Sequence, residues 1–214
     1  MSINRQILDS IAENMVAVIG APYDENSTYM RGSAGAPLKI REALHCGSAN
    51  LCSEDGHDLG KEALVKDLGD LAFTTSQSPL AEIERAVGQV LERKAQVLLL
   101  GGDHAVTPAV LRAYHRQYGQ INLLQFDAHP DLYDVFEGNP NSHACPFARI
   151  MEEKRVKRLV QVGIRTMNPH QQEQAERFGV EVIPMKAWRP GMVLHFDGPL
   201  YISFDMDALD PAFA

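Results

Sequence analysis

Acidic and histidine residues follow one apolar segment at alternate positions. The stretch LLQFDAHPDLYD, residues 123–134, begins like a buried strand, and Asp127, His129 and Asp131 come directly after its apolar part. Alternate residues of an extended chain point the same way, so these three side chains are expected to face one point. Burying unpaired carboxylates close together is costly. The pattern therefore predicts that a positive charge lies between them.

Two further segments have the same layout, an apolar strand followed by acidic or histidine residues. They are LLLGGDHAVTP (98–108) and YISFDMDALDP (201–211). The carboxyl ends of parallel strands share one edge of a sheet, and ligands bind outside that edge. Six side chains from the three segments are therefore expected to converge: His104, Asp127, His129, Asp131, Asp205 and Asp207.

The chemistry of these six side chains indicates a pair of metal ions. Four carboxylates and two imidazoles are too many for one ion and suit two ions that share carboxylates. The set has no thiolate, which disfavours a structural zinc site. Oxygen-rich sites with some imidazole match Mn²⁺ best, and Mg²⁺, Co²⁺ or Zn²⁺ less well. A lone Asp at a strand end is usually a turn former, but that does not explain three such segments.

The elements that must position these residues alternate between strand and helix. Apolar runs predict strands at 15–22, 96–102, 121–127, 158–164, 180–184 and 200–205. Helical periodicity predicts helices at 79–94, 107–119, 143–157 and 168–179. Thr107 is expected to cap its helix, with Pro108 at the first helical position and Gly119 at the end. This order predicts a three-layer α/β/α fold with a mainly parallel sheet, in one domain over residues 1–214.

The bulk properties exclude several classes of function. The net charge of -8 argues against general binding to nucleic acid or anionic membranes. No segment is apolar enough for a signal peptide or a membrane span. Cys46, Cys52 and Cys145 form neither an even set nor a CxxC pair, which favours a reducing, cytoplasmic setting. A disulfide between Cys46 and Cys52 is the alternative.

The motifs together resemble those of the ureohydrolase (arginase/agmatinase) family. Three of them look like its metal-binding motifs, and three more extend the likeness: GGDH (101–104), DAHPDLYD (127–134), SFDMDALDPAFA (203–214), SHACPF (142–147), VGIRT (162–166) and MRGSAGAPLKIREAL (30–44). The resemblance implies an arginase/deacetylase-like fold. Residues 133–145 do not look like the Ser/Thr/Asn-rich loop of arginases, so the likeness to agmatinases is greater. The family normally continues beyond a motif like ALDPAFA, so we expect a fold shortened at its C-terminus.

The resemblance also implies a role for each residue of the site. Asp127 and Asp205 match the carboxylates that bridge two manganese ions. The remaining ligands divide between the two ions, with His104 and Asp131 on one and His129 and Asp207 on the other.

Two residues are expected to move protons. Asp131 would accept a proton from the nucleophile, and His143 would pass one to the leaving amine or to solvent. Arg165 is expected to be structural rather than substrate-binding, and Cys145 to be a small packing residue near the site.

The expected substrate is a small cationic guanidino compound. Four aspartates, two divalent ions and one hydroxide leave the cluster near minus one, which favours a cation. The resemblance implies hydrolysis to urea and an amine, with agmatine giving putrescine. Arginine and guanidino acids such as guanidinobutyrate are alternatives, as are a one-zinc deacetylase and an inactive metal-binding scaffold. Relatives are commonly trimers or hexamers, so a homo-oligomer is expected.

Overall fold

The chain folds into two compact units in a computed structural model that describes residues 3–61, 64–74 and 78–212. The first unit is Met1–Ala113 and the second is Tyr114–Ala214. The motif at 203–214 therefore ends on two residues that lie outside the described part. Whether residues 1–214 act as a single domain stays a prediction.

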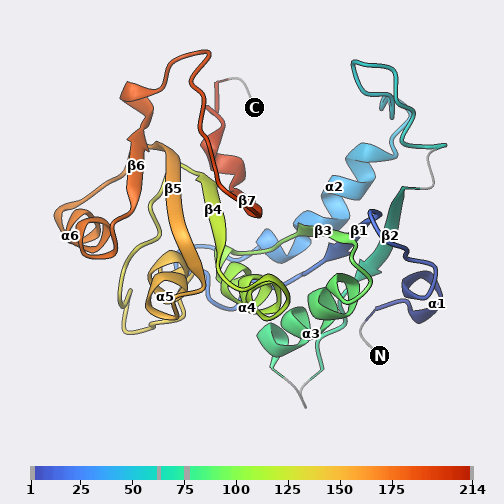
Figure 1. Cartoon of the computed structure of the whole chain (residues 1–214), viewed down its shortest axis with the longest axis horizontal. Coiled ribbons are helices and arrows are strands. Elements are labelled where there is room, and N and C mark those ends of the chain that lie inside the picture. The colour runs from blue at the N-terminus through green and yellow to red at the C-terminus, as the bar shows by residue number, and fades with distance from the viewer. Residues whose placement is uncertain (1–2, 62–63, 75–77, 213–214) are drawn as a thin grey trace. The chain divides into compact units, whose positions relative to one another are not determined.

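The first unit contains a parallel three-stranded sheet with the order β2-β1-β3 (Figure 1). Its strands are β1 (Val16–Gly20), β2 (Val65–Asp70) and β3 (Gln96–Leu100). Its helices are α1 (Arg5–Leu8), η1 (Ser33–Gly35), α2 (Ala36–Leu44), α3 (Pro79–Leu91) and η2 (His104–Val106), and the boundary between the units falls within α4 (Thr107–Tyr118).

Helix α3 shows how apolar spacing builds this unit. Ile83, Val87 and Val90 recur at helical intervals, and all three are fully buried. The helix contacts β3, so its apolar face covers the sheet. The helix predicted at 79–94 is confirmed, although it ends at Leu91.

The second unit contains a parallel four-stranded sheet with the order β6-β5-β4-β7. Its strands are β4 (Ile121–Phe126), β5 (Val156–Ile164), β6 (Glu181–Pro184) and β7 (Leu200–Phe204). Its helices are α5 (Pro146–Glu152), α6 (Pro169–Phe178), η3 (Met185–Ala187) and η4 (Met206–Ala208). The six predicted strands are all present, and the predicted α/β fold with parallel strands is confirmed.

The strand register places different residues on the two faces of this sheet. Gln125 of β4 lies opposite Gln161 of β5 and Ser203 of β7, in a polar row that crosses three strands. The opposite face carries the buried cluster of Leu124, Val160 and Val162, against which residues of the 183–196 segment pack.

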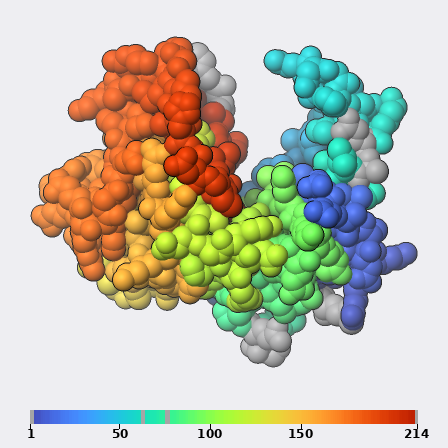
Figure 2. Space-filling view, viewed as in Figure 1, coloured from blue at the N-terminus to red at the C-terminus, as the bar shows by residue number. Residues whose placement is uncertain are grey.

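Apolar side chains remain exposed along β7 and after it. Leu200, Ile202 and Phe204 alternate along the strand and are 39%, 54% and 53% exposed. Residues beyond about 185, coloured orange to red, form a visible part of the surface in Figure 2. Strand β7 is also an edge of its sheet, since it pairs only with β4 among the described strands.

Several local predictions were wrong. The helix predicted at 143–157 is shorter, because the backbone of Lys154 is left-handed (φ 54°) and Val156 already belongs to β5. Thr107 does not cap α4. The capping carboxylate is that of Asp103, which accepts a hydrogen bond from the Ala105 N–H and starts η2 ahead of α4. Strand β2 and helices α1 and α2 were not predicted.

The described residues bear on two further points from the sequence, a membrane span and a disulfide. None of their helices is both long and apolar enough to cross a lipid bilayer. Cys46, Cys52 and Cys145 are free thiols, so the alternative disulfide between Cys46 and Cys52 is not formed.

Candidate metal centre

Three of the predicted ligands meet in the second unit. Asp127 and His129 follow β4, and Asp207 lies in η4 after β7. Each offers one ligand atom, and these atoms lie within 4.8 Å of one another. Nδ1 of His129 is 2.9 Å from Oδ2 of Asp207 and 3.7 Å from Oδ1 of Asp127. The pairing of β4 with β7 brings these residues together across some 80 positions of sequence.

This group is closed on one side and open on the other. Asp127 is only 1% exposed, whereas the side chains of His129 and Asp207 are about half exposed. Hydrogen bonding to Asp127 and Asp207 raises the pKa of His129 to about 10. The surrounding carboxylates therefore strongly favour a positive charge at this position.

Asp131 joins Asp127 from the following turn. The two residues offer carboxylate oxygens within 4.8 Å of each other, so Asp127 has a potential co-ligand on each side. Asp131 is 8% exposed and has a left-handed backbone (φ 49°), which is unusual for a residue other than glycine. The next N–H, that of Leu132, donates to Oε1 of the buried Gln171 on α6 at 3.1 Å. Gln171 thus holds the turn in place.

The segment that contains His143 is attached to the same turn. The N–H of Tyr133 donates to the carbonyl of Ala144 at 3.2 Å, and the N–H of Phe147 donates to the carbonyl of Asp131 at 3.2 Å. His143 is partly buried and precedes α5. Its role in proton transfer stays a prediction.

Arg165 supports the turn that carries Asp207. Its guanidinium donates to the Asp207 carbonyl at 2.5 Å, and its backbone N–H donates to the carbonyl of Ala128 at 2.9 Å. The N–H of Ala128 in turn donates to Oδ1 of Asp207 at 3.1 Å. These contacts give Arg165 a structural place between the two ligand segments, in line with the sequence-based expectation.

Asp205 does not join the group of Asp127, His129 and Asp207. Its Oδ1 accepts a hydrogen bond from the N–H of Asp207 at 3.0 Å, so the side chain caps η4. Its predicted bridging role would require this carboxylate to coordinate while it also caps the turn.

His104 belongs to the first unit, where a tight turn presents it. A Cβ at Gly102 would lie 1.9 Å from the Tyr23 carbonyl oxygen, so only glycine fits there. Asp103 accepts hydrogen bonds from Ala105 N, Asn26 N and Ser27 Oγ, and burial raises its pKa to about 6. These contacts explain Gly102 and Asp103 of the GGDH motif. Ligation by His104 stays a prediction.

The described residues of the second unit fit a divalent metal. Their donors are carboxylate oxygens and one imidazole nitrogen, without a thiolate, and this set suits Mn²⁺ among the common ions. The buried Asp127 carboxylate requires a compensating positive charge, and its two flanking groups provide further ligands. Asp127 lies close to Asp131 and also to His129 and Asp207, as expected of a carboxylate between two ions.

Three buried glutamines around these ligands were not predicted from the sequence. Gln125 and Gln161 lie within β4 and β5, and Gln171 lies on α6. A signal was present, because Gln125 and Gln161 each interrupt an otherwise apolar run directly before a motif. Neither glutamine stood out because each lies in a run whose other residues are mostly apolar.

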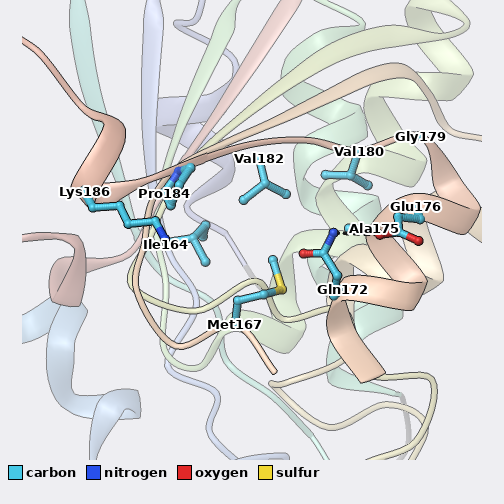
Figure 3. Close-up of a pocket in the computed structure, with 10 residues that line it drawn as sticks. All are labelled: Ile164, Met167, Gln172, Ala175, Glu176, Gly179, Val180, Val182, Pro184 and Lys186. Carbon is cyan, nitrogen blue, oxygen red and sulfur yellow. Dashed lines mark hydrogen bonds between the residues drawn. The ribbon is translucent and has the colours of Figure 1, made fainter. Parts of the chain in front are cut away.

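A separate pocket of about 440 Å³ lies between α6 and the β5–β6 side of the sheet (Figure 3). Its lining is mostly apolar, with Ile164, Met167 and Val182 among the contributors. Gln172 and Glu176 are hydrogen-bonded to each other at 2.9 Å. The lining includes none of the predicted site residues, so this pocket is distinct from the metal centre.

Comparison with known proteins agrees with the fold and the motifs. The sequence pattern described as "Arginase family" matches residues 14–214. Arginase 1, mitochondrial, of Arabidopsis thaliana is 40% identical over 219 residues, which cover 95% of this chain and 64% of that protein.

Two solved structures are similar to the chain. The arginase of Medicago truncatula has a TM-score of 0.76 at 37% identity, covering 85% of this chain and 60% of that one. The agmatine ureohydrolase of Thermoplasma volcanium has a TM-score of 0.80 at 28% identity, covering 94% and 70%.

The match extends over nearly all of this chain but not over all of its relatives. The chain spans 64% of the length of the Arabidopsis protein and 63% of the rice arginases. The matched range, residues 14–214, covers the positions of the predicted metal ligands and of His143. The chain therefore belongs to the arginase family.

Proposed function

We propose that the chain is a hydrolase that uses two manganese ions to cleave a guanidino group into urea and an amine. The observation that carries this proposal is the buried Asp127 carboxylate, flanked by Asp131 on one side and by His129 and Asp207 on the other. Family membership supports the same chemistry.

Six residues would hold the ions. By the family resemblance, these would be His104, Asp127, His129, Asp131, Asp205 and Asp207. Bound divalent metal would lower the pKa of water to about 7 and so make hydroxide available at neutral pH.

The chain's own residues would attract the substrate and move protons. The acidic cluster favours a cationic guanidinium group, as the raised pKa of His129 illustrates. Asp131, fixed in its turn by Gln171, would accept a proton. His143, at the attached segment, would return one to the leaving amine.

Arginine is the first substrate to test, because the Arabidopsis and Medicago relatives are both arginases. Agmatine is the second. The segment 133–145 does not resemble the loop that arginases use for an amino-acid head group, and the Thermoplasma neighbour is an agmatine ureohydrolase. Guanidinobutyrate completes the panel.

Metal content and urea release test the proposal together. Two Mn²⁺ per chain and urea from one member of the panel would support it. Metal without urea from any of them would favour the non-hydrolysing scaffold, and absence of both would contradict the proposal.

Two variants distinguish metal binding from proton transfer. Asp127→Ala should lose bound metal and activity together, while Asp197→Ala, at an exposed aspartate, should keep both. His143→Ala should keep the metal and lose rate, with the exposed His195→Ala as its control. Retention of both metals by Asp127→Ala would refute the assignment.

Assembly and location are separate proposals. We infer a homo-oligomer, since arginase-family enzymes are commonly oligomeric, and sedimentation velocity would measure its size. A cytoplasmic location is supported by the three free thiols, which suit a reducing compartment. Localisation of a tagged chain would test it.

A further inference from the structure

Two glutamines occupy the interior of the second unit where apolar residues are the rule. Gln125 of β4 and Gln161 of β5 are both fully buried, and they lie opposite each other in the parallel pairing. Their neighbours on the same face, Leu123 and Leu159, are apolar and also buried. Two amides in such surroundings are costly unless their polar atoms are hydrogen-bonded.

The two amides form a chain of hydrogen bonds that ends on Asp127. Nε2 of Gln161 donates to Oε1 of Gln125 and to the Pro130 carbonyl, both at 2.6 Å. Nε2 of Gln125 donates to Oδ2 of Asp127 at 2.8 Å and to the His129 carbonyl at 3.0 Å. The hydrogen bonds of the two amides therefore reach the predicted bridging carboxylate and the backbone of the turn beyond it.

The donor and acceptor of each hydrogen bond in this series are fixed by the groups at its two ends. A backbone carbonyl and a carboxylate only accept hydrogen bonds, so Nε2 must be the atom that each glutamine directs at Pro130 and Asp127. Gln125 then has only Oε1 left to receive the amide of Gln161. Both glutamine orientations follow from the network.

We propose that Gln125 and Gln161 are positioning residues that hold the Asp127 carboxylate for metal binding, an inference that rests on the proposed function. Gln125 donates to one oxygen of Asp127, and the His129 N–H donates to the other at 2.7 Å. Both carboxylate oxygens are therefore oriented from the protein side, and each keeps a lone pair for a metal.

A purely structural role explains the arrangement less well. Methionine or leucine would fill the same space without the need for partners. The pair also leaves Oε1 of Gln161 without a hydrogen-bond donor among the described residues, a cost that an apolar packing residue would avoid. Three of the four acceptors that the two amides serve lie at positions 127–130, the segment that carries the ligands.

Manganese affinity tests the role of this hydrogen-bond relay, which runs from Gln161 through Gln125 to Asp127. Gln125→Met and Gln161→Met keep the side-chain length and remove the amide. Gln174→Met is the control, at a buried glutamine of α6 whose Oε1 accepts a hydrogen bond from Arg177 at 3.2 Å. Free Mn²⁺ measured by electron paramagnetic resonance gives the dissociation constant. Loss of a group that orients a metal ligand typically weakens binding about 10–100-fold, and we expect this for Gln125→Met.

Gln161, at the far end of the relay, should affect Mn²⁺ affinity less than Gln125 does, and it should act through Gln125. Gln161→Met should weaken binding to a smaller degree, and the double variant should lose less affinity than the two single losses combined. The melting temperature of each variant in EDTA reports stability without metal. A purely structural role would lower that temperature and leave the manganese affinity unchanged.

A measurement on the wild-type chain tests the proposal even if the variants fail to fold. The side-chain amide signals of Gln125 and Gln161 should shift on titration with diamagnetic Mg²⁺, while that of Gln174 should not. Wild-type chain that binds no Mn²⁺ would overturn the proposed function itself. Wild-type binding with unchanged affinity in both variants, or with unshifted Gln125 and Gln161 signals, would overturn the relay alone.

Discussion

Burial controls the chemistry of single residues in this chain, and the thiols show it as clearly as the carboxylates. Cys145 is fully buried, and Sγ lies 3.7 Å from the carbonyl oxygen of Asn139. Burial raises the pKa of its thiol to about 11. Cys46 and Cys52 are exposed. Since the thiolate is the reactive form, the three cysteines should differ sharply in reactivity.

Alkylation should separate these thiols. Iodoacetamide at pH 8 should label Cys46 and Cys52 in the folded chain and Cys145 only after addition of urea, as read by mass spectrometry. A Cys145→Ala control should give the same labelling when folded and one label fewer when unfolded. Labelling of Cys145 as fast as the exposed pair would contradict its burial.

Gly163 illustrates a residue chosen by backbone geometry. Its φ is 93°, and an added Cβ would lie 3.2 Å from the carbonyl oxygen of Asp127. Gly163→Ala should destabilise the chain by about 1–3 kcal/mol from the backbone alone, and further through that contact.

Urea unfolding would measure this cost. Gly179→Ala is the matched control, because Gly179 also has a positive φ (65°) but nothing lies within 4 Å of its added Cβ. It should lose only about 1–2 kcal/mol. Equal losses at the two positions would mean that the approach to Asp127 contributes nothing.

At the scale of elements, α6 supports the ligand segments through its first turn. Oδ1 of Asn168 accepts a hydrogen bond from Gln171 N at 2.9 Å, and Gln171 itself holds the turn after Asp131. Nδ2 of Asn168 also donates to the Tyr133 hydroxyl. The start of this helix is therefore tied to the segment that follows the second metal motif.

Removing this cap should cost measurable stability. Asn168→Ala should lower the free energy of unfolding by about 0.5–2 kcal/mol, as N-cap substitutions do. Ser78→Ala is the control, since Ser78 precedes α3 without a side-chain capping bond and should be nearly neutral. Asn168→Asp keeps the cap and loses the donor to Tyr133. If Asn168→Ala proves as mild as Ser78→Ala, the cap does not stabilise α6.

The sequence predicted those elements whose side chains are buried in a regular pattern. The apolar runs of β1, β4 and β5 are legible because most of their side chains are covered, as in parallel strands with helices on both faces. Strand β7 was predicted from its apolar residues alone, although Leu200, Ile202 and Phe204 are exposed. Strand β2 was missed because VKDLGD buries only Leu68, and α2 because its sole buried residue is Pro37. The end of α5 was misplaced because Lys154 takes a left-handed conformation without being glycine.

The same reasoning sets the limit for the site. Asp127, His129 and Asp131 are recognisable because their spacing is local. The contact of Gln125 with Gln161 joins residues 36 positions apart, and it depends on a strand register that composition does not reveal. Asp103 was missed as a cap because a turn of 3₁₀ helix precedes α4.

For the whole molecule, metal should act as a stabilising ligand. Any ion that binds only the folded state adds stability by mass action, about 2.7 kcal/mol per site at a hundredfold excess over the dissociation constant. For a chain of this size, such a gain raises the melting temperature by roughly 5–10 °C.

Calorimetry with and without EDTA would measure the shift. Mn²⁺ should raise the melting temperature of wild type, and EDTA should reverse the rise. Asp127→Ala should melt at the same temperature in both conditions. If Mn²⁺ leaves the melting temperature of the wild-type chain unchanged, the result would argue against a metal centre.

The polar row of Ser203, Gln125 and Gln161 also bears on how the strands find their partners during folding. A slip of one residue between β5 and β4 would turn Gln161 toward the opposite face, where Leu124 and the other apolar residues cluster. An amide buried there without a partner costs roughly 1–3 kcal/mol. A wholly apolar sheet would lack this penalty and tolerate mispairing more readily. The side chains proposed to orient Asp127 would thus also discriminate against misregistered sheets before any metal is bound.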